Sequence, residues 1–366
     1  MSDSGITDAA RAGFDACLAD ADEEAAVELA TGLVASGVSA EDVLLQLVAP
    51  AQVRVGKRWE SGEWSVAQEH AATHVSRRTV DGIASAAREI ARSRAGAGSR
   101  GQVLVACSDG EWHILPADIL TEVLRLRGFD VRSLGGSVSP HGILSDVHQN
   151  GPDVVAVSCT LPWNLPLAYR QIEICRWAGV PVITGGTGFG PGGTWAYTLG
   201  ADMYAADARG AAETLLRGWP PVLRGESSVQ ADAVEAYAML VRQRPGLLEH
   251  LTSALRDVCP NLGGRPGPEH GSGTGTGGTG HEEGTGFLGR LLDSLAAAVF
   301  VDDERVFTGH LAFVRTYFSA RSADSRWLLV MVDALADRLS ESPRALDKLS
   351  AARRFLVEGD GSHRPG

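Results

Sequence analysis

The stretch SDGEWHILPADIL, residues 108–120, places a histidine between a run of small apolar residues and an amphipathic helical segment. His113 follows a predicted strand, and histidine is the commonest protein ligand of metal ions. Glu111 stands two residues earlier, and a carboxylate at that spacing can hold one ring nitrogen while the other faces a metal ion. The alternative is an ordinary exposed loop histidine. This stretch by itself leaves the two hypotheses equal.

Two further strand ends carry residues that suit a bound ligand. Ser158, Cys159 and Thr160 close one predicted strand, and Gly185 and Gly186 close the next. In an open parallel sheet, ligands lie over the carboxyl ends of the strands. Hydroxyl groups and bare backbone at these two ends would line a slot beside the sheet. Each feature alone is common, because Ser, Thr and Gly are also ordinary turn residues.

A third group of residues lies nearer the start of the chain. Trp59 is followed after nine residues by Glu69 and His70. The stretch SVAQ, residues 65–68, is a capping box that predicts the start of a helix. This start places Val66, Glu69 and His70 on one helix face, and Trp59 ends the preceding helix close to it. The alternative for the tryptophan is a large core residue that anchors two helices.

A fourth group lies near the end of the chain, where residues 300–327 are rich in aromatic and basic side chains. His310 and Tyr317 approximate one helical face, and Arg315 and Arg321 could pair with carboxylates. An apolar, aromatic pocket with basic groups suits an organic ligand that carries carboxylates. A core stripe in a plain helical domain explains the same pattern equally well.

The elements that position the first three groups follow from the periodicity of apolar residues. Residues 1–95 predict a four-helix bundle, and residues 93–101 have the composition of a linker. Over residues 100–224, five short apolar runs alternate with helical stretches, which predicts a Rossmann-like, doubly wound, five-stranded parallel sheet. The predicted strands are 102–107, 130–134, 153–158, 181–185 and 202–206.

Residues 230–358 predict an all-α C-terminal domain of globin-like type. The glycine-rich stretch 263–286 interrupts it and predicts a disordered loop, because such a composition buries too little apolar surface. Cys259, just before this loop, could form a thioether, although a lone cysteine is usually a small buried residue.

Residues 100–224 resemble the cobalamin-binding domain of methionine synthases, corrinoid proteins and mutases. In that family a histidine from a D-x-H-x-x-G motif is the lower cobalt ligand, and the displaced dimethylbenzimidazole tail occupies a slot beside the sheet. This chain has Glu111 where the family has aspartate and Pro116 where it has the last glycine. The resemblance implies that His113 binds cobalt with Glu111 as its partner. It assigns the tail slot to Ser158, Thr160, Gly185 and Gly186.

The bundle resembles the cap of cobalamin-dependent photoreceptors, in which Trp, Glu and His cover the 5′-deoxyadenosyl group of adenosylcobalamin. Light cleaves the cobalt–carbon bond of these proteins, and the bundle then shifts. The resemblance implies that Trp59, Val66, Glu69 and His70 cover the upper face. Transcriptional members have a cobalt-binding histidine directly after the tryptophan, and Glu60 stands there in this chain.

The order of the three predicted domains resembles the photocobilins, which join a cobalamin module to a bilin-binding helical domain. This resemblance implies a bilin such as biliverdin beside His310, Arg315, Tyr317 and Arg321. A DNA-binding domain like that of the transcriptional members is not expected, because the residues before 100 are all needed for the bundle.

The composition bounds the function. A formal net charge of −12 argues against broad binding to nucleic-acid phosphates, and direct DNA binding is not expected. No apolar run approaches the roughly 18 residues that span a bilayer, no signal peptide is apparent, and five scattered cysteines indicate a reduced, cytoplasmic setting. The leading prediction is a cytoplasmic light sensor, not an enzyme, that binds adenosylcobalamin and a bilin. A homo-oligomer and an unspecified downstream protein are further partners to consider.

Two rival functions stay open. One is a corrinoid protein that carries a methyl group for a methyltransferase system. The other is a cobalamin-binding scaffold whose C-terminal tail binds another protein.

Overall fold

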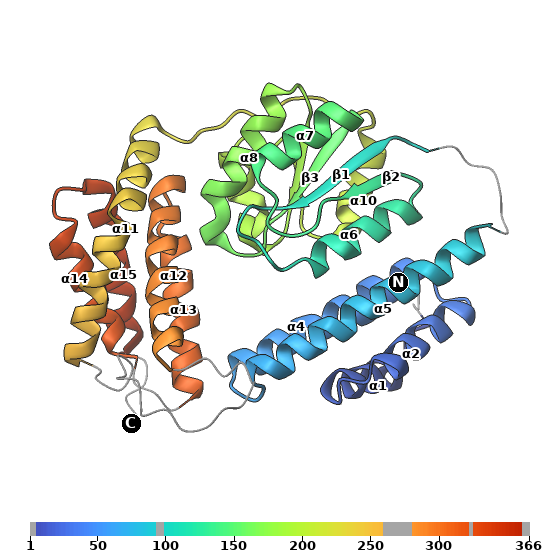
Figure 1. Cartoon of the computed structure of the whole chain (residues 1–366), viewed down its shortest axis with the longest axis horizontal. Helices are drawn as coiled ribbons and strands as arrows, with labels where there is room; N and C mark the ends of the chain where they lie inside the picture. Colours follow the sequence, from blue (N-terminus) through green and yellow to red (C-terminus); the bar gives the residue numbers. More distant parts are fainter. Residues whose placement is uncertain (1–4, 93–98, 259–279, 322–324, 361–366) are drawn as a thin grey trace, which may run out of the picture. The chain divides into compact units, whose positions relative to one another are not determined.

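The structure of the chain is a computed structural model that describes residues 5–92, 99–258, 280–321 and 325–360. The chain divides into two compact units, Met1–Ser228 and Val229–Gly366. The first unit contains a helical bundle and a parallel sheet, and the second is built from helices (Figure 1). The predicted combination of a bundle, a Rossmann-like domain and an all-helical C-terminal region is confirmed.

The bundle at the start of the first unit has four helical rods. The first two are α1 (Asp8–Ala19) and α2 (Glu23–Ala35), and the fourth is α5 (Val66–Arg92). The third rod is continuous but changes its hydrogen bonding: α3 (Ala40–Val43) passes through a π-helical segment, η1 (Leu44–Val48), into α4 (Ala49–Glu60).

The π-helical segment precedes a proline in the second position of α4. Pro50 has no N–H to continue the ordinary ladder, and the N–H of Ala49 donates to the carbonyl of Leu44, five residues back. The wider turn therefore carries the chain up to the proline without ending the helix. It also sets the rotation of α4, which carries Trp59.

The predicted capping box at the start of α5 is confirmed. The Ser65 hydroxyl accepts a hydrogen bond from the Gln68 N–H at 3.2 Å, and the Gln68 side chain accepts one from the Ser65 N–H at 2.9 Å. These two bonds satisfy backbone donors that the first helical turn leaves open. They define where α5 begins and hence which residues share a face with Val66.

The sheet has the order β2-β1-β3-β4-β5, and all neighbouring strands are parallel. All five predicted strands are confirmed to within two residues. They are β1 (Gln102–Cys107), β2 (Asp130–Ser133), β3 (Val154–Ser158), β4 (Val182–Gly185) and β5 (Met203–Ala205). β2 lies on one side of β1, and β3 lies on the other side, followed by β4 and β5. The strand order therefore reverses between β1 and β3. In doubly wound sheets, that reversal opens the crevice in which ligands bind.

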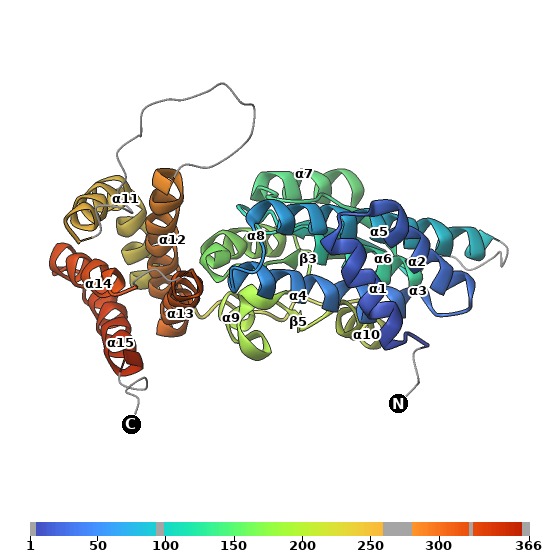
Figure 2. The same cartoon turned by 90° about the horizontal axis from the view of Figure 1, so that it is seen from below.

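Five helices alternate with the strands. They are α6 (Leu115–Leu126), α7 (Pro140–Asn150), α8 (Leu165–Trp177), α9 (Thr194–Thr198) and α10 (Ala208–Arg217). Helices α6 and α10 cover the face of the sheet toward the bundle, and α7 and α8 cover the other (Figure 1). The turn between α4 and α5 lies toward the same end of the unit as the carboxyl ends of the strands (Figures 1 and 2).

The bundle and the sheet domain share one hydrophobic core, in which Phe14 and Leu44 of the bundle belong to the same cluster as Leu124 of α6. Ion pairs reinforce this junction. Glu41 lies 2.6 Å from the Arg127 guanidinium and 2.8 Å from that of Arg209, and its side chain is only 12% exposed. Hydrogen bonds from Arg127 and Arg209 outweigh the effect of burial and lower the pKa of Glu41 below its ordinary value of 4.5.

Replacing Glu41 with alanine should lower the free energy of unfolding of the first unit by about 1 to 3 kcal/mol at neutral pH, because two arginines lose a charged acceptor. Since the folded-state pKa is depressed, this stabilisation is present above pH 4.5 and disappears as the pH falls through the folded-state pKa. Urea unfolding at neutral and acidic pH measures both effects.

The control for this variant is Asp8→Ala, which removes the ion pair between the fully exposed Asp8 and the partly exposed Arg11 and should leave stability almost unchanged. A Glu41→Ala variant as stable as the wild type at neutral pH would show that the junction depends on apolar packing alone.

The second unit contains five helices among its described residues. They are α11 (Ala231–Val258), α12 (Gly280–Val301), α13 (Glu304–Ala320), α14 (Trp327–Arg338) and α15 (Pro343–Asp360). Most of the predicted glycine-rich loop, and Cys259, lie outside the described residues. The loop prediction is wrong for residues 280–286, which belong to α12, because adding a turn to an existing helix costs far less than starting one.

Candidate functional site

The loop between β1 and α6 holds His113 against a buried carboxylate. Glu111 is fully buried, and its Oε1 accepts a hydrogen bond from the His113 N–H at 3.0 Å. The same oxygen lies 2.5 Å from Nδ1 of the His113 ring. Because a carboxylate engages Nδ1, Nε2 is the ring nitrogen suited to bind a metal ion. The side chain of His113 is 54% exposed, so a ligand can reach it.

The other carboxylate oxygen of Glu111 connects this loop to the next strand. Oε2 accepts hydrogen bonds from the backbone N–H groups of Thr160 at 2.8 Å and Leu161 at 3.0 Å. Burial alone would raise the pKa of Glu111, but the hydrogen bonds from His113 and Thr160 lower it overall. Glu111 is therefore an ionised bridge across the crevice between β1 and β3, and it also orients His113.

A cavity of about 100 Å³ lies at the carboxyl ends of β3, β4 and β5. Ser158, Gly185 and Gly186 line it, as the sequence predicts, together with Pro116 and Leu120 from α6. Thr160 is not among the lining residues; its N–H binds Glu111 and its carbonyl accepts from the Thr187 hydroxyl. The predicted slot therefore exists, with one of its four predicted residues acting in the neighbouring loop.

Gly186 keeps this slot open because no other residue fits its backbone. Its φ of +102° and ψ of 160° lie in a region essentially restricted to glycine. A Cβ added at Gly186 would lie 2.3 Å from the Cys159 carbonyl oxygen, so β3 and β4 could not keep their present spacing. Gly186, the second glycine of the pair, is thus required by close backbone approach.

Two thiols lie close to these loops. Burial raises the pKa of Cys107, at the end of β1, to about 12, and it raises that of Cys159 as well. The charge of Glu111 acts in the same direction on both. At neutral pH both side chains are thiols rather than thiolates.

The turn between α4 and α5 gathers the predicted cap residues. Trp59 is half-buried in the last turn of α4, and Val66, at the start of α5, is 44% exposed. Glu69 Oε2 lies 2.5 Å from His70 Nδ1, and the His70 side chain is 74% exposed. The end of α4 thus carries an aromatic side chain, and the start of α5 carries an aliphatic side chain and a hydrogen-bonded carboxylate–imidazole pair.

Several polar side chains at these sites carry no clear sequence signal. Asn164 is buried beside Glu111, with Nδ2 3.5 Å from Oε2. Gln171 is buried, and its amide donates to the carbonyls of Cys107 and Val138. Both lie in or near α8, where an isolated amide could not be matched with its partner from spacing alone. Trp64, rather than Trp59, is the deeply buried tryptophan of the hairpin.

Comparison with known protein families identifies the fold of the first unit. Residues 101–216 match the profile described as B12 binding domain, and residues 11–83 match a second profile of the same description. The chain contains a cobalamin-binding domain. The first matched segment coincides with the sheet domain that carries His113, and the second lies within the helical bundle.

Curated corrinoid proteins are similar to this cobalamin-binding unit. Trimethylamine corrinoid protein 2 of Methanosarcina acetivorans is 25% identical over 51% of this chain and 86% of its own length. Trimethylamine corrinoid protein of Methanosarcina barkeri is 26% identical over 53% of this chain and 89% of its own length. The solved structure of the Methanosarcina barkeri monomethylamine corrinoid protein covers 56% of this chain and 95% of its own, at 18% identity and a TM-score of 0.46.

The residues of the cobalamin-binding domain fit the cofactor chemically. A corrin ring would supply four nitrogen ligands to cobalt, so a single imidazole such as that of His113 would be a sufficient protein ligand. Among the described residues, no cluster of three or more His, Cys, Asp or Glu side chains could hold a free metal ion. The carboxylate-held His113 and the glycine-gated slot match the lower ligand and the tail of cobalamin.

The residues predicted to bind a bilin are buried or stacked on aromatic rings in the described part of the second unit. His310 and Tyr317 are only 6% and 9% exposed, and burial lowers the pKa of His310 to about 4. Arg321 lies over the Tyr317 ring, with 3.6 Å between the guanidinium carbon and the ring centroid, and Arg315 lies over Phe355 at 4.9 Å. These side chains pack with one another and with the core of the unit. The structure does not support the predicted bilin or the globin-like comparison.

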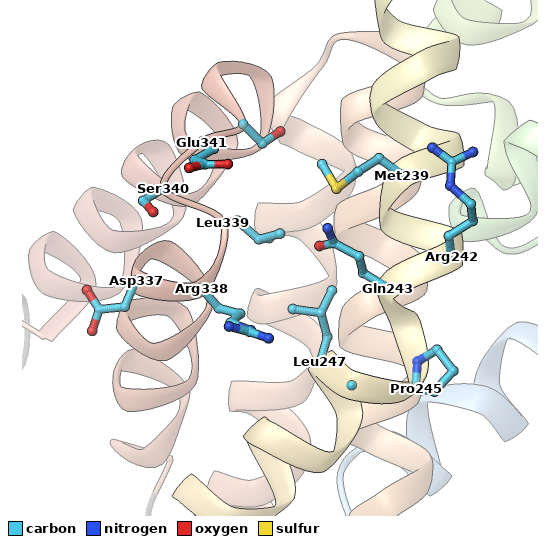
Figure 3. Close-up of a pocket in the computed structure, with 12 residues that line it drawn as sticks. Met239, Arg242, Gln243, Pro245, Leu247, Asp337, Arg338, Leu339, Ser340 and Glu341 are labelled. Carbon is cyan, nitrogen blue, oxygen red and sulfur yellow. The ribbon is translucent and has the colours of Figure 1, made fainter.

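One groove of the second unit lies away from these residues. A groove of about 700 Å³ separates the middle of α11 from the end of α14 and the loop before α15 (Figure 3). Its lining residues include Met239 and Leu247 on one side and Arg338 and Leu339 on the other. None of the four predicted bilin residues lines this groove.

A membrane anchor is not seen in the described part of the chain, where every helix is too short or too polar to cross a bilayer.

Proposed function

We propose that the first unit is a corrinoid module that carries a group on cobalt to or from a methyltransferase partner. The observation that supports this function is the similarity to corrinoid proteins, which extends over 86% to 89% of the length of the two relatives described above. Both relatives are named for trimethylamine. The proposal does not extend this substrate to the present chain.

The roles of the residues in this proposal follow from the site geometry. Cobalamin supplies a cobalt atom that bears an exchangeable upper group. His113 would bind the lower face through Nε2 while Glu111 holds Nδ1. The cofactor tail would enter the slot at Ser158, Gly185 and Gly186. The α4–α5 turn would cover the upper face, where Trp59 and Val66 exclude water and Glu69 and His70 provide hydrogen-bonding groups.

A second candidate function is a light sensor that binds adenosylcobalamin, and one observation favours it. Trp59 ends α4, and the hydrogen-bonded Glu69–His70 pair lies near the start of α5, the next helix of the same hairpin. A methyl group has no hydrogen-bonding atoms to use these side chains, whereas adenosine offers both donors and a stacking surface. Adenosylcobalamin would supply a light-sensitive cobalt–carbon bond, and Trp59, Glu69 and His70 would hold its adenosyl group. The bilin is not part of this proposal, because His310 and Tyr317 are buried and both arginines stack on aromatic rings.

The cofactor and the cap together distinguish the two candidates. Cobalamin extracted in the dark from the purified chain should be the methyl or hydroxo form for a carrier and the adenosyl form for a sensor. If the cap accommodates adenosine, Trp59→Ala should lower the ratio of affinities for adenosylcobalamin over methylcobalamin by about 2- to 10-fold, since ring stacking is lost. Titration followed by absorption measures this ratio.

The matched control is Trp177→Ala in α8, which removes a tryptophan that is 80% exposed and should leave the ratio unchanged. An unaltered ratio for Trp59→Ala, combined with extraction of methylcobalamin, would eliminate the sensor. A wild-type chain that binds neither cobalamin would contradict both functions.

A further inference from the structure

A chain of hydrogen bonds runs across the α4–α5 hairpin and ends at the cap histidine. The Gln52 Nε2 amide donates to the Thr73 hydroxyl at 2.6 Å, and Thr73 Oγ1 donates to Glu69 Oε1 at 2.9 Å. The other oxygen of Glu69 lies 2.5 Å from His70 Nδ1. This series of hydrogen bonds starts on α4 and continues along the first turns of α5, so it connects both helices of the hairpin.

The direction of each bond follows from the number of protons available. An ionised carboxylate can only accept, so Thr73 donates its single proton to Glu69 and must accept from Gln52. The opposite orientation of the Gln52 amide would draw that hydroxyl proton away from the carboxylate. Oε1 of Gln52 is buried and has no hydrogen-bond partner in the described structure, so the interaction with Thr73 is what orients the amide.

The last hydrogen bond of this series, between Glu69 and His70, determines which nitrogen of His70 carries the proton. Glu69 accepts from both sides, and its Oε2 requires a proton on Nδ1 of His70. In the neutral ring Nε2 is then an acceptor. Glu111 holds His113 in the same way on the sheet side, with the same carboxylate-to-Nδ1 distance of 2.5 Å.

We propose that Gln52 and Thr73 are positioning residues that hold Glu69 and thereby keep His70 in the Nδ1–H tautomer. His70 would then present Nε2 as a hydrogen-bond acceptor to the group on the upper face of the cobalamin. The proposal rests on cobalamin binding with its upper face toward the α4–α5 hairpin, which both candidate functions share, and on an upper group that can donate a hydrogen bond, which adenosyl offers and methyl does not. It assigns selectivity for the upper group in part to residues that do not touch it.

The test compares Thr73→Val, which keeps the shape but loses the hydroxyl, with Thr73→Ser, which keeps the hydroxyl. Nitrogen-15 NMR of the full chain without cobalamin, at about pH 8.5, above the ordinary pKa of a free imidazole, reports the His70 tautomer. Nδ1–H should dominate in the wild type and in Thr73→Ser, and both tautomers should be populated in Thr73→Val. Gln52→Leu, on the other helix, should produce a smaller change in the same direction.

The second measurement is the ratio of affinities for adenosylcobalamin over methylcobalamin, which Thr73→Val should lower by about 2- to 10-fold, the effect of one hydrogen bond. Thr73→Ser should restore the ratio. An unchanged tautomer in a folded Thr73→Val variant would overturn the proposal, and so would a changed tautomer with an unchanged ratio. Failure of the wild type to bind cobalamin would instead contradict the proposed function, and the NMR comparison would still test the hydrogen-bond chain.

Discussion

His113→Ala should weaken cobalamin binding by more than about 100-fold, since loss of a partner behind a metal ligand alone typically costs 10- to 100-fold. The bound cofactor should also lose the absorption spectrum of imidazole-ligated cobalt, because no other described histidine lies in the loops at the carboxyl ends of β1, β3 and β4. Titration of the purified variant with cobalamin, followed by absorption, measures affinity and coordination together.

The control for this variant is His148→Ala, which removes an exposed histidine from α7 and should change neither quantity. Free imidazole added to His113→Ala should restore part of the imidazole-ligated spectrum, since the buried Glu111 remains to hold the added ring. A His113→Ala variant with the wild-type spectrum and affinity would show that cobalt is bound by a different group.

Gly186→Ala should lower the free energy of unfolding of the first unit by about 2 to 5 kcal/mol, which combines backbone strain with forced overpacking. The new Cβ would lie 2.3 Å from the Cys159 carbonyl oxygen, so β3 and β4 would have to separate. The slot lined by Gly186 should then distort, and cobalamin affinity should fall as well. Denaturant unfolding and cobalamin titration of the same preparation measure the two effects.

Gly151→Ala is the matched control because Gly151 also has a positive φ, +60°, but a Cβ there would meet no atom within 4 Å. This control should cost only about 1 to 2 kcal/mol and leave cobalamin binding intact. Equal losses of stability in the two variants would mean that backbone conformation, and not the approach of β3 to β4, makes Gly186 necessary.

The fold of the first unit was largely predictable because its signals are local. Alternating short apolar runs and helical stretches predict the five strands, and the Ser65–Gln68 capping box predicts the start of α5. The interaction between His113 and Glu111 was also predictable, since the two residues are only two positions apart. By contrast, the bond from Glu111 to the backbone of Thr160 joins residues 49 positions apart, and no sequence spacing indicates it.

The aromatic and basic stretch of the second unit shows the opposite case. His310, Tyr317 and Arg321 have the composition of a ligand pocket, yet they pack into or against the core. An arginine can stack on an aromatic ring as readily as it pairs with a carboxylate, so composition alone does not distinguish the two. Only the positions of neighbouring helices decide, and those depend on packing between distant segments.

The buried thiols of Cys107 and Cys159 affect the redox behaviour of the site. Thiolates are strong ligands of transition metals and react quickly with oxidants, whereas protonated thiols do neither well. Because burial raises the pKa of both cysteines, and that of Cys107 to about 12, thiolate is almost absent at neutral pH. If His113 binds cobalt as proposed, the sulfur atoms of Cys107 and Cys159 would therefore neither compete with its imidazole for the metal nor be readily oxidised beside it.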